Sequence, residues 1–257
     1  SPRAVQTLRE VDFIAAEDTR VTQKLLSHFQ IKKPMISYYQ HNLRERGEEI
    51  LARIEAGENC AIVTDAGMPC ISDPGEDLVG LCAARDIPTV VIPGPSAAIS
   101  ALAVSGLPTS RFCFEGFLST NRKNRMEHLH QISGDQHTLI FYEAPHKLIY
   151  TLQDMLEVLG DRRIALCREL TKLHEEVLRF TLAEAVAYYE ENAPKGEYVL
   201  VVAGAAPKTG AVVTLEDGVA QVLALKEQGM RLKDAAKEVA EHTGLSKNEL
   251  YAAALER

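Results

Sequence analysis

The segment Thr64–Gly75 constrains the fold of this chain more than any other stretch, because it contains two glycines, two prolines and two aspartates. It follows the apolar run Cys60–Val63, which is typical of a buried parallel strand, and precedes a helical pattern over Glu76–Arg85. Open α/β sheets bind ligands at the carboxyl ends of such strands. Glycine lets a backbone approach a ligand closely, and proline restricts the loop. The segment therefore predicts an α/β sheet with a ligand loop at this strand end.

A second loop of similar composition, Pro93–Ala97, follows the apolar run Thr89–Ile92, which we predict to be the next strand. The carboxyl ends of neighbouring parallel strands lie at one edge of a sheet. The two loops are therefore expected to line one pocket rather than to serve as separate turns.

Strand and helix patterns alternate through the first part of the chain, which predicts βαβ units and a parallel sheet. Beyond Gly106–Ser110, the strands Ile164–Arg168 and Val177–Phe180 follow each other directly, which indicates a mixed sheet. We predict two α/β domains, residues 1–107 and 108–205, with a cofactor cleft between them, and a small C-terminal helical domain over residues 206–257 that includes a linker. The tail has a helix-turn-helix outline, and a packing or dimerisation bundle is the alternative.

Composition narrows the class of protein. The net charge of −8 argues against a surface coated for nucleic acid, so any RNA contact must be local. The five cysteines are odd in number and widely spaced, which favours reduced thiols in a cytoplasmic protein. No apolar run is long enough to span a membrane, and no signal peptide is expected. Neither CxxC nor HExxH occurs, so we expect no metal site.

The chemistry-bearing residues do not form a common nucleotide or hydrolase motif. The sequence contains no GxGxxG, no P-loop and no GxSxG elbow. Polar residues gather instead at predicted strand ends, in the segments Glu17–Arg20, Tyr142–Lys147 and Arg168–Lys172.

Five short motifs then identify a family. TDAGMPCISDPG, PGPSA, AAEDTR, FYEAPHK and RELTK, in their order and spacing along the chain, closely resemble the bacterial 16S rRNA 2′-O-ribose cytidine methyltransferases. Those enzymes belong to the tetrapyrrole-methylase-like family, which depends on S-adenosylmethionine. The resemblance covers nearly all of residues 1–205, and the tail resembles the small helix-turn-helix domain of many members.

The resemblance implies methyl transfer from S-adenosylmethionine to a cytidine ribose, family position 1402, in 16S rRNA of the small ribosomal subunit. It also implies a homodimer. Family members usually begin with a strand and a Pro-Ile-Gly-Asn-type loop before the helix that opens here at Pro2. This sequence begins without them, so we expect the cleft formed by these residues to lack part of its wall.

The resemblance and the strand-end positions together give three groups of candidate site residues. Those expected to bind the cofactor are Asp65, Ala66, Gly67, Ile71, Ser72, Asp73, Pro93, Gly94, Ser96, Ala97, Tyr142 and Leu170. Those expected to assist catalysis are Asp18, Glu169 and Lys172. Those expected to bind RNA are Arg20, Arg122, Lys123, Arg125, His146, Lys147 and Arg168.

Each group has a structural alternative. The loop aspartates can bond the amides of their own turns, and Ser96 can cap the following helix. Asp18 with Arg20 can be a local ion pair, and the charged residues of Arg168–Lys172 can form a surface ion pair. The segment Asn121–Arg125 can be a solvated loop or helix start. At the level of function, the alternatives are a methyltransferase acting on a tetrapyrrole carbon and a non-catalytic RNA-binding protein of the same fold.

Overall fold

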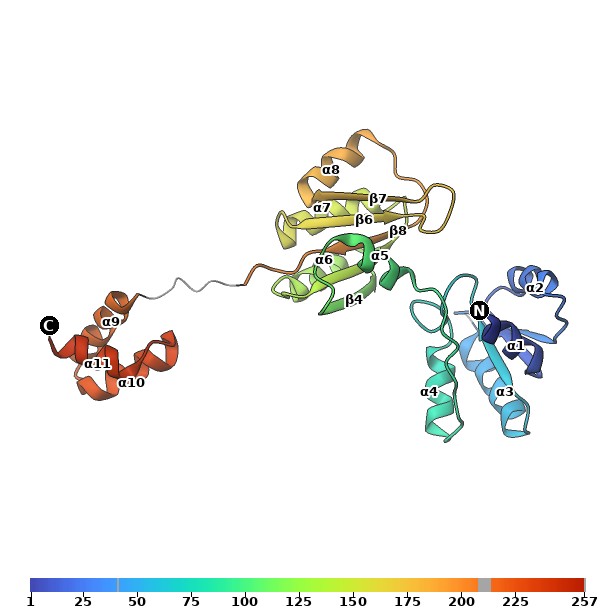
Figure 1. Cartoon of the computed structure of the whole chain (residues 1–257), viewed down its shortest axis with the longest axis horizontal. Coiled ribbons are helices and arrows are strands. Elements are labelled where there is room, and N and C mark those ends of the chain that lie inside the picture. The colour runs from blue at the N-terminus through green and yellow to red at the C-terminus, as the bar shows by residue number, and fades with distance from the viewer. Residues whose placement is uncertain (41, 208–213, 257) are drawn as a thin grey trace. The chain divides into compact units, whose positions relative to one another are not determined.

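The computed structural model describes residues 1–40, 42–207 and 214–256. Contacts divide the chain into two compact units, Ser1–Ala205 and Ala206–Arg257, and each is described by itself (Figure 1).

The first unit begins with a parallel three-stranded sheet in the order β2-β1-β3. The strands are β1 (Phe13–Ala16), β2 (Met35–Ser37) and β3 (Cys60–Val63), and the helices are α1 (Pro2–Glu10), α2 (Thr19–His28), α3 (Leu43–Glu55) and α4 (Glu76–Ala84). Side chains of β1 alternate between two cores: Phe13 packs with residues of α3 and α4, and Ile14 packs with residues of α1 and α2. Helices therefore cover both faces of the sheet, as βαβ units require.

The predicted strand Thr89–Ile92 is wrong. This segment has no strand assignment, and Val90 and Val91 are 70% and 64% exposed. Its β-branched composition favours extended backbone, but a strand also needs a neighbour to satisfy its hydrogen bonds. Among the described residues, β3 pairs with β1 on one edge and no strand pairs with Thr89–Ile92.

A second, five-stranded sheet follows in the order β4-β5-β8-β6-β7. Only β4 and β5 pair in parallel, so the prediction of a mixed sheet is confirmed. The strands are β4 (Phe112–Phe117), β5 (Thr138–Glu143), β6 (Arg163–Arg168), β7 (Glu176–Thr181) and β8 (Tyr198–Val202), and the helices are α5 (Ala97–Ser105), α6 (Arg122–Ile132), α7 (Leu148–Leu159) and α8 (Leu182–Glu191).

The two faces of this second sheet are covered unequally (Figure 1). Leu139 and Phe141 of β5 face the core formed with α6, α7 and α8, whereas Ile140 faces α5. Helix α5 thus packs on the second sheet although it precedes the predicted boundary at residue 107. The division into domains 1–107 and 108–205 stays a prediction.

The second unit consists, in its described part, of α9 (Leu215–Glu227), α10 (Leu232–Thr243) and α11 (Lys247–Leu255). A capping box joins Thr214 and Asp217 at the start of α9. Gly218 lies where a Cβ would come within 2.7 Å of Leu245 and Leu250, so α9 approaches its neighbours closely. Residues 208–213 of the predicted linker lie outside the described part of the chain. None of the helices within the described ranges is long and apolar enough to cross a membrane.

Candidate functional site

The structure brings the two glycine- and proline-rich loops into direct contact. The backbone N–H of Met68 donates a hydrogen bond to the carbonyl oxygen of Pro95 at 3.0 Å. Gly67 has φ +83°, and a Cβ there would lie 3.0 Å from that same oxygen. A Cβ on Gly94 would lie 3.4 Å from the sulfur of Met68. Glycine is therefore needed at position 67 for both its backbone conformation and the close approach of the loops.

The longer loop stores backbone strain. Cys70 and Ser72 have φ of 73° and 62°, in the left-handed region that non-glycine residues rarely adopt. Such residues persist only where the surrounding structure holds them, and they concentrate at ligand sites. Asp65, Ala66, Ile71, Pro93 and Ala97 are exposed on the two loops.

Acidic side chains gather where β1 and β3 end. The hydroxyl of Thr64 donates to Glu17 at 2.5 Å, and the backbone N–H of Asp65 donates to the same carboxylate at 3.3 Å. Burial, and then the charge of Glu17, raises the pKa of Asp73 to about 6. The same two causes, in the same order, raise the pKa of Asp65. This edge of the sheet therefore favours a cationic ligand group.

Glu17 was not among the predicted site residues. The signal that could have found it is positional, because Glu17 directly follows the last residue of β1, as Thr64 follows the last residue of the neighbouring strand β3, with Asp65 next.

Tyr142 connects this region to the second sheet. Its phenol oxygen accepts a hydrogen bond from the backbone N–H of Ala98, at the start of α5, at 3.2 Å. Its ring meets Phe114 and Phe117 edge-on at 5.0 and 5.5 Å between centroids. Leu170 packs against the same core as Ala98 and Tyr142. The cofactor candidates thus come from both sheets of the first unit.

The predicted cap at Ser96 is not observed. Ser96 occupies the N-cap position of α5, but its side chain makes no capping hydrogen bond. Its carbonyl oxygen instead accepts the hydroxyl of Ser100 at 2.7 Å. The Ser96 hydroxyl is therefore not engaged by its own helix.

Asp18 and Arg20 form the local ion pair that was the structural alternative for them. The Asp18 carboxylate caps α2 by accepting the backbone N–H of Arg20 at 2.8 Å, and it also bonds the Arg20 guanidinium at 2.6 Å. The side chain, then the backbone, of Arg20 lowers the pKa of Asp18 to about 2. Asp18 is therefore a weak base, although Arg20 stays exposed.

Glu169 and Lys172 likewise form an ion pair, beside Glu197. Lys172 lies 2.9 Å from Glu169 and 2.8 Å from Glu197. Hydrogen bonds to Glu197 and then Glu169 raise the pKa of Lys172, and the backbone of Glu197 followed by Lys172 lowers that of Glu169. At neutral pH both groups are therefore charged.

The basic segment on α6 divides into buried and exposed parts. Arg125 is only 7% exposed and bonds Asp154 and the carbonyl oxygen of Ser119 at 2.7 and 2.9 Å. Arg122 is exposed and pairs with both Asp154 and Glu157, and Lys123 is exposed. The expectation that Arg125 faces RNA conflicts with its burial, because its charge neutralises Asp154 inside the fold.

The remaining RNA candidates lie at the ends of β5 and β6. His146 is exposed in the turn before α7, and Lys147 lies 3.9 Å from the buried carboxylate of Glu143. Arg168 lies 3.4 Å from Glu176 on the neighbouring strand β7.

Comparison with known proteins places this geometry in a family. The family profile "Tetrapyrrole (Corrin/Porphyrin) Methylases" matches residues 1–186. The chain belongs to the tetrapyrrole methylase family. A second profile, "RsmI C-terminal HTH domain", matches residues 213–257.

One relative and two solved structures show how far the similarity reaches. The "Ribosomal RNA small subunit methyltransferase I" of Synechocystis sp. is 48% identical over 100% of this chain and 92% of its own length. The fold resembles the methyltransferase CobJ with a TM-score of 0.60 at 17% identity, covering 80% of this chain and 88% of that one. It also resembles uroporphyrin-III C-methyltransferase from Thermus thermophilus, solved with S-adenyl homocysteine, with a TM-score of 0.52 at 16% identity, covering 78% and 90%. The family and the two-sheet fold predicted from the motifs are therefore confirmed.

Proposed function

We propose that this protein transfers a methyl group from S-adenosylmethionine to the ribose 2′-hydroxyl of a cytidine, family position 1402, in 16S rRNA of the small ribosomal subunit. The observation that carries the proposal is the fitted pair of loops at Met68 and Pro95. It occurs in a chain 48% identical over its whole length to a ribosomal RNA small subunit methyltransferase I.

The loops suit this cofactor. S-adenosylmethionine supplies an electrophilic methyl group on a cationic sulfonium. Burial, and then the charge of Glu17, raises the pKa values of Asp65 and Asp73, so a cationic ligand would stabilise the ionised forms of both carboxylates. Gly67 and Gly94 leave backbone accessible where side chains would block it. We assign these four residues to cofactor binding, together with Tyr142 and Leu170.

Catalysis in this arrangement relies on positioning rather than on a strong base. Asp18 is too acidic to remove a hydroxyl proton efficiently, and Lys172 is held protonated by two carboxylates. In-line displacement depends strongly on the alignment of the two reacting groups. We therefore assign Asp18, Glu169 and Lys172 to orienting the RNA strand by charge and hydrogen bonding.

An acidic protein can use a local basic surface for a folded subunit. Lys123, Arg20, His146 and Lys147 carry the exposed or partly exposed basic groups that we assign to RNA. Arg122 and Arg168 contribute after partial neutralisation by their acidic partners. The sulfhydryl groups of all five cysteines are free, which suits the cytoplasm where ribosomes reside.

We further propose that two copies form a dimer through apolar residues of the first unit. Ile99 and Val104 of α5 are 52% and 43% exposed. Val90 and Val91 are more exposed still, at 70% and 64%. Exposed apolar side chains of this size favour association. Sedimentation should show a dimer that Ile99→Glu with Val104→Glu converts to monomers, and unchanged sedimentation would contradict this interface.

The decisive experiment uses labelled S-adenosylmethionine and small subunits that lack the modification. We expect label in one cytidine of 16S rRNA, on the ribose, and none in subunits that are already modified. A parallel reaction with a porphyrinogen tests the tetrapyrrole alternative. Label in a base, in the porphyrinogen alone, or nowhere would overturn the proposed reaction.

A further inference from the structure

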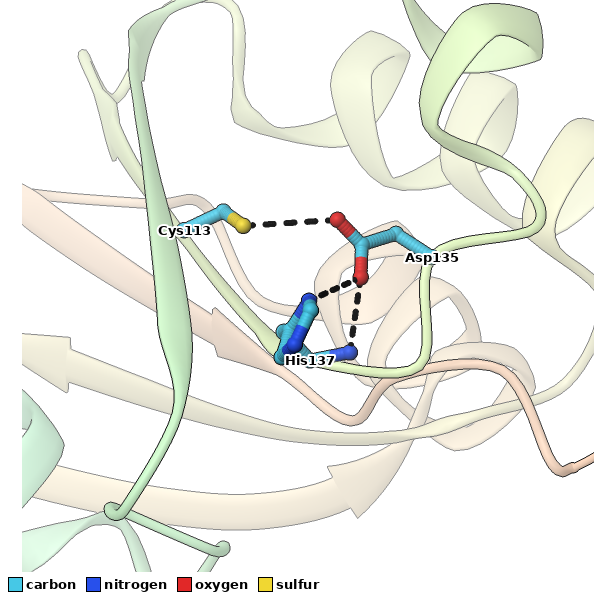
Figure 2. Close-up of side chains that lie close together, drawn as sticks. All are labelled: Cys113, Asp135 and His137. Atoms are coloured by element: carbon cyan, nitrogen blue, oxygen red, sulfur yellow. Dashed lines mark hydrogen bonds and ion pairs between the residues drawn. The ribbon is translucent and has the colours of Figure 1, made fainter.

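Three side chains whose types can bind a metal ion lie close together where β4 and β5 begin (Figure 2). Cys113 lies at the start of β4, and Asp135 and His137 lie in the turn that leads into β5. The sulfur of Cys113 is 3.3 Å from one Asp135 oxygen, and Nδ1 of His137 is 2.6 Å from the other. All three candidate ligand atoms lie within 4.8 Å of one another.

We propose that Cys113, Asp135 and His137 bind one zinc ion. A thiolate, an imidazole and a carboxylate form a ligand set that zinc accepts, whereas magnesium and calcium prefer oxygen alone. Tetrahedral zinc with bonds of about 2.0–2.3 Å places its ligand atoms roughly 3.3–3.7 Å apart. The sulfur–carboxylate distance of 3.3 Å already lies at that value, and the 2.6 Å between Nδ1 of His137 and Asp135 must open by about an ångström.

The backbone fixes this geometry before any ion binds. Asp135 accepts the backbone N–H of His137 at 2.8 Å, which holds the turn closed. The Asp135 and His137 side chains remain 26% and 30% exposed, so an ion can enter from solvent. Binding displaces the thiol proton of Cys113 to the buffer, Nδ1 of His137 binds after its proton has moved to Nε2 through solvent, and a water molecule completes the fourth position.

The cluster lies beside a backbone contact between the turn before β5 and the segment that follows β8. The N–H of Ala205 donates to the carbonyl oxygen of Asp135 at 2.6 Å, just after β8 ends. A zinc ion would therefore hold together the start of β4, the turn before β5 and the segment that follows β8. The site is distinct from the proposed cofactor loops, and its test does not depend on the methyltransferase reaction.

The full chain is first stripped of metal with a chelator and dialysed. Zinc is then added, and the bound zinc is measured. We expect one bound zinc per chain, a rise in thermal midpoint on adding zinc, and, with cobalt as probe, a sulfur-to-metal charge-transfer band. Cys113→Ser should remove that band and weaken zinc binding by more than about tenfold while the other four cysteines remain. His137→Gln and Asp135→Asn should weaken binding similarly.

His128→Gln is the matched control, because His128 also bonds a carboxylate, that of Glu115 at 2.8 Å, on the same strand β4. Zinc binding should be unchanged in this variant. Equal thermal midpoints of wild type and Cys113→Ser in chelator would show that the variant folds. A stoichiometry below one in the wild type, a charge-transfer band that survives Cys113→Ser, or equal weakening by His128→Gln would overturn the proposal.

Discussion

Two charged regions of the first unit differ in how their charges are balanced. Asp154 on α7 is buried and bonds two arginines of α6, Arg122 and Arg125. At the ends of β1 and β3, Asp73 and Asp65 lie near Glu17, and their pKa values rise. A buried charge that keeps its partners costs the fold less than one that loses them, whereas unbalanced charge is held at a cost and favours a ligand of opposite sign. The contrast separates a packing role from a binding role.

The largest expected effect concerns the balanced region. Arg125→Ala should lower the free energy of unfolding by about 3 kcal/mol, because it leaves the buried Asp154 with only one partner. Arg122→Ala, which removes a 61% exposed side chain, should cost about 1 kcal/mol or less. Urea unfolding followed by circular dichroism measures both. Equal losses would contradict the division between buried and exposed arginines.

The next effect concerns the contact between the loops. Gly67→Ala should weaken S-adenosylmethionine binding by more than about tenfold, because its Cβ would push against Pro95. Gly57→Ala is the control, since Gly57 also has a positive φ, of +99°, but no atom within 4 Å of a Cβ. Titration calorimetry measures the affinities. If the two variants bind the cofactor alike, the loop contact does not shape the site.

The raised pKa of Asp73 predicts that ionisation of this carboxyl lowers the stability of the protein. Its folded pKa of about 6 lies above the ordinary 3.8, so its contribution to stability is full below pH 3.8 and is lost as the pH rises through about 6. Asp73→Asn should therefore stabilise the protein at pH 7–8 by about 1 kcal/mol, after allowance for solvent screening, while weakening cofactor binding.

Asp12→Asn should change the stability in the opposite direction, because hydrogen bonds from Asn59 lower the pKa of Asp12. That variant should lose stability at neutral pH and approach the wild type as the pH falls. Thermal unfolding from pH 4 to pH 8 distinguishes the two, and destabilisation by Asp73→Asn at pH 8 would show that Asp73 is balanced after all.

The smallest effect concerns the exposed basic residues. Lys123→Glu should reduce the rate on small subunits by about 2–3-fold at low salt and less at high salt, as expected for a single phosphate contact. Lys24→Glu, an exposed lysine on α2, should have no effect. An equal loss in both variants would indicate general repulsion from RNA rather than a local surface.

The sequence predicts the elements well where local patterns and end signals agree. The strand Cys60–Val63 is observed with its predicted bounds, and the strand Ile164–Arg168 and the helix Glu76–Arg85 each differ from the observed bounds by one residue. Thr89–Ile92 was mispredicted because strand pairing is a long-range property that composition does not contain. The two loops were expected to lie together because each follows a predicted strand; they are in contact although only one of them follows an observed strand.

The site is harder to predict than the fold, because charge balance depends on residues far apart in sequence. The sequence does not distinguish Arg125 from Lys123, because both are basic residues of one segment. Arg125 is buried because it bonds Asp154 on the next helix. Cys113 and Asp135 are 22 residues apart in the chain, so no short spacing motif reveals their contact. The assignments to cofactor, RNA and catalysis stay predictions until the binding experiments are done.

The close approach at Gly218 has a genetic consequence. In the interior of a helix, alanine is preferred over glycine by about 1 kcal/mol, yet here a methyl group would meet Leu245 and Leu250 at 2.7 Å. Both contacts are with the ends of flexible side chains. A defect caused by Gly218→Ala should therefore have intragenic suppressors that shorten one of these leucines. The tail would then gain helix propensity through a two-step mutational path whose first step alone is unfavourable.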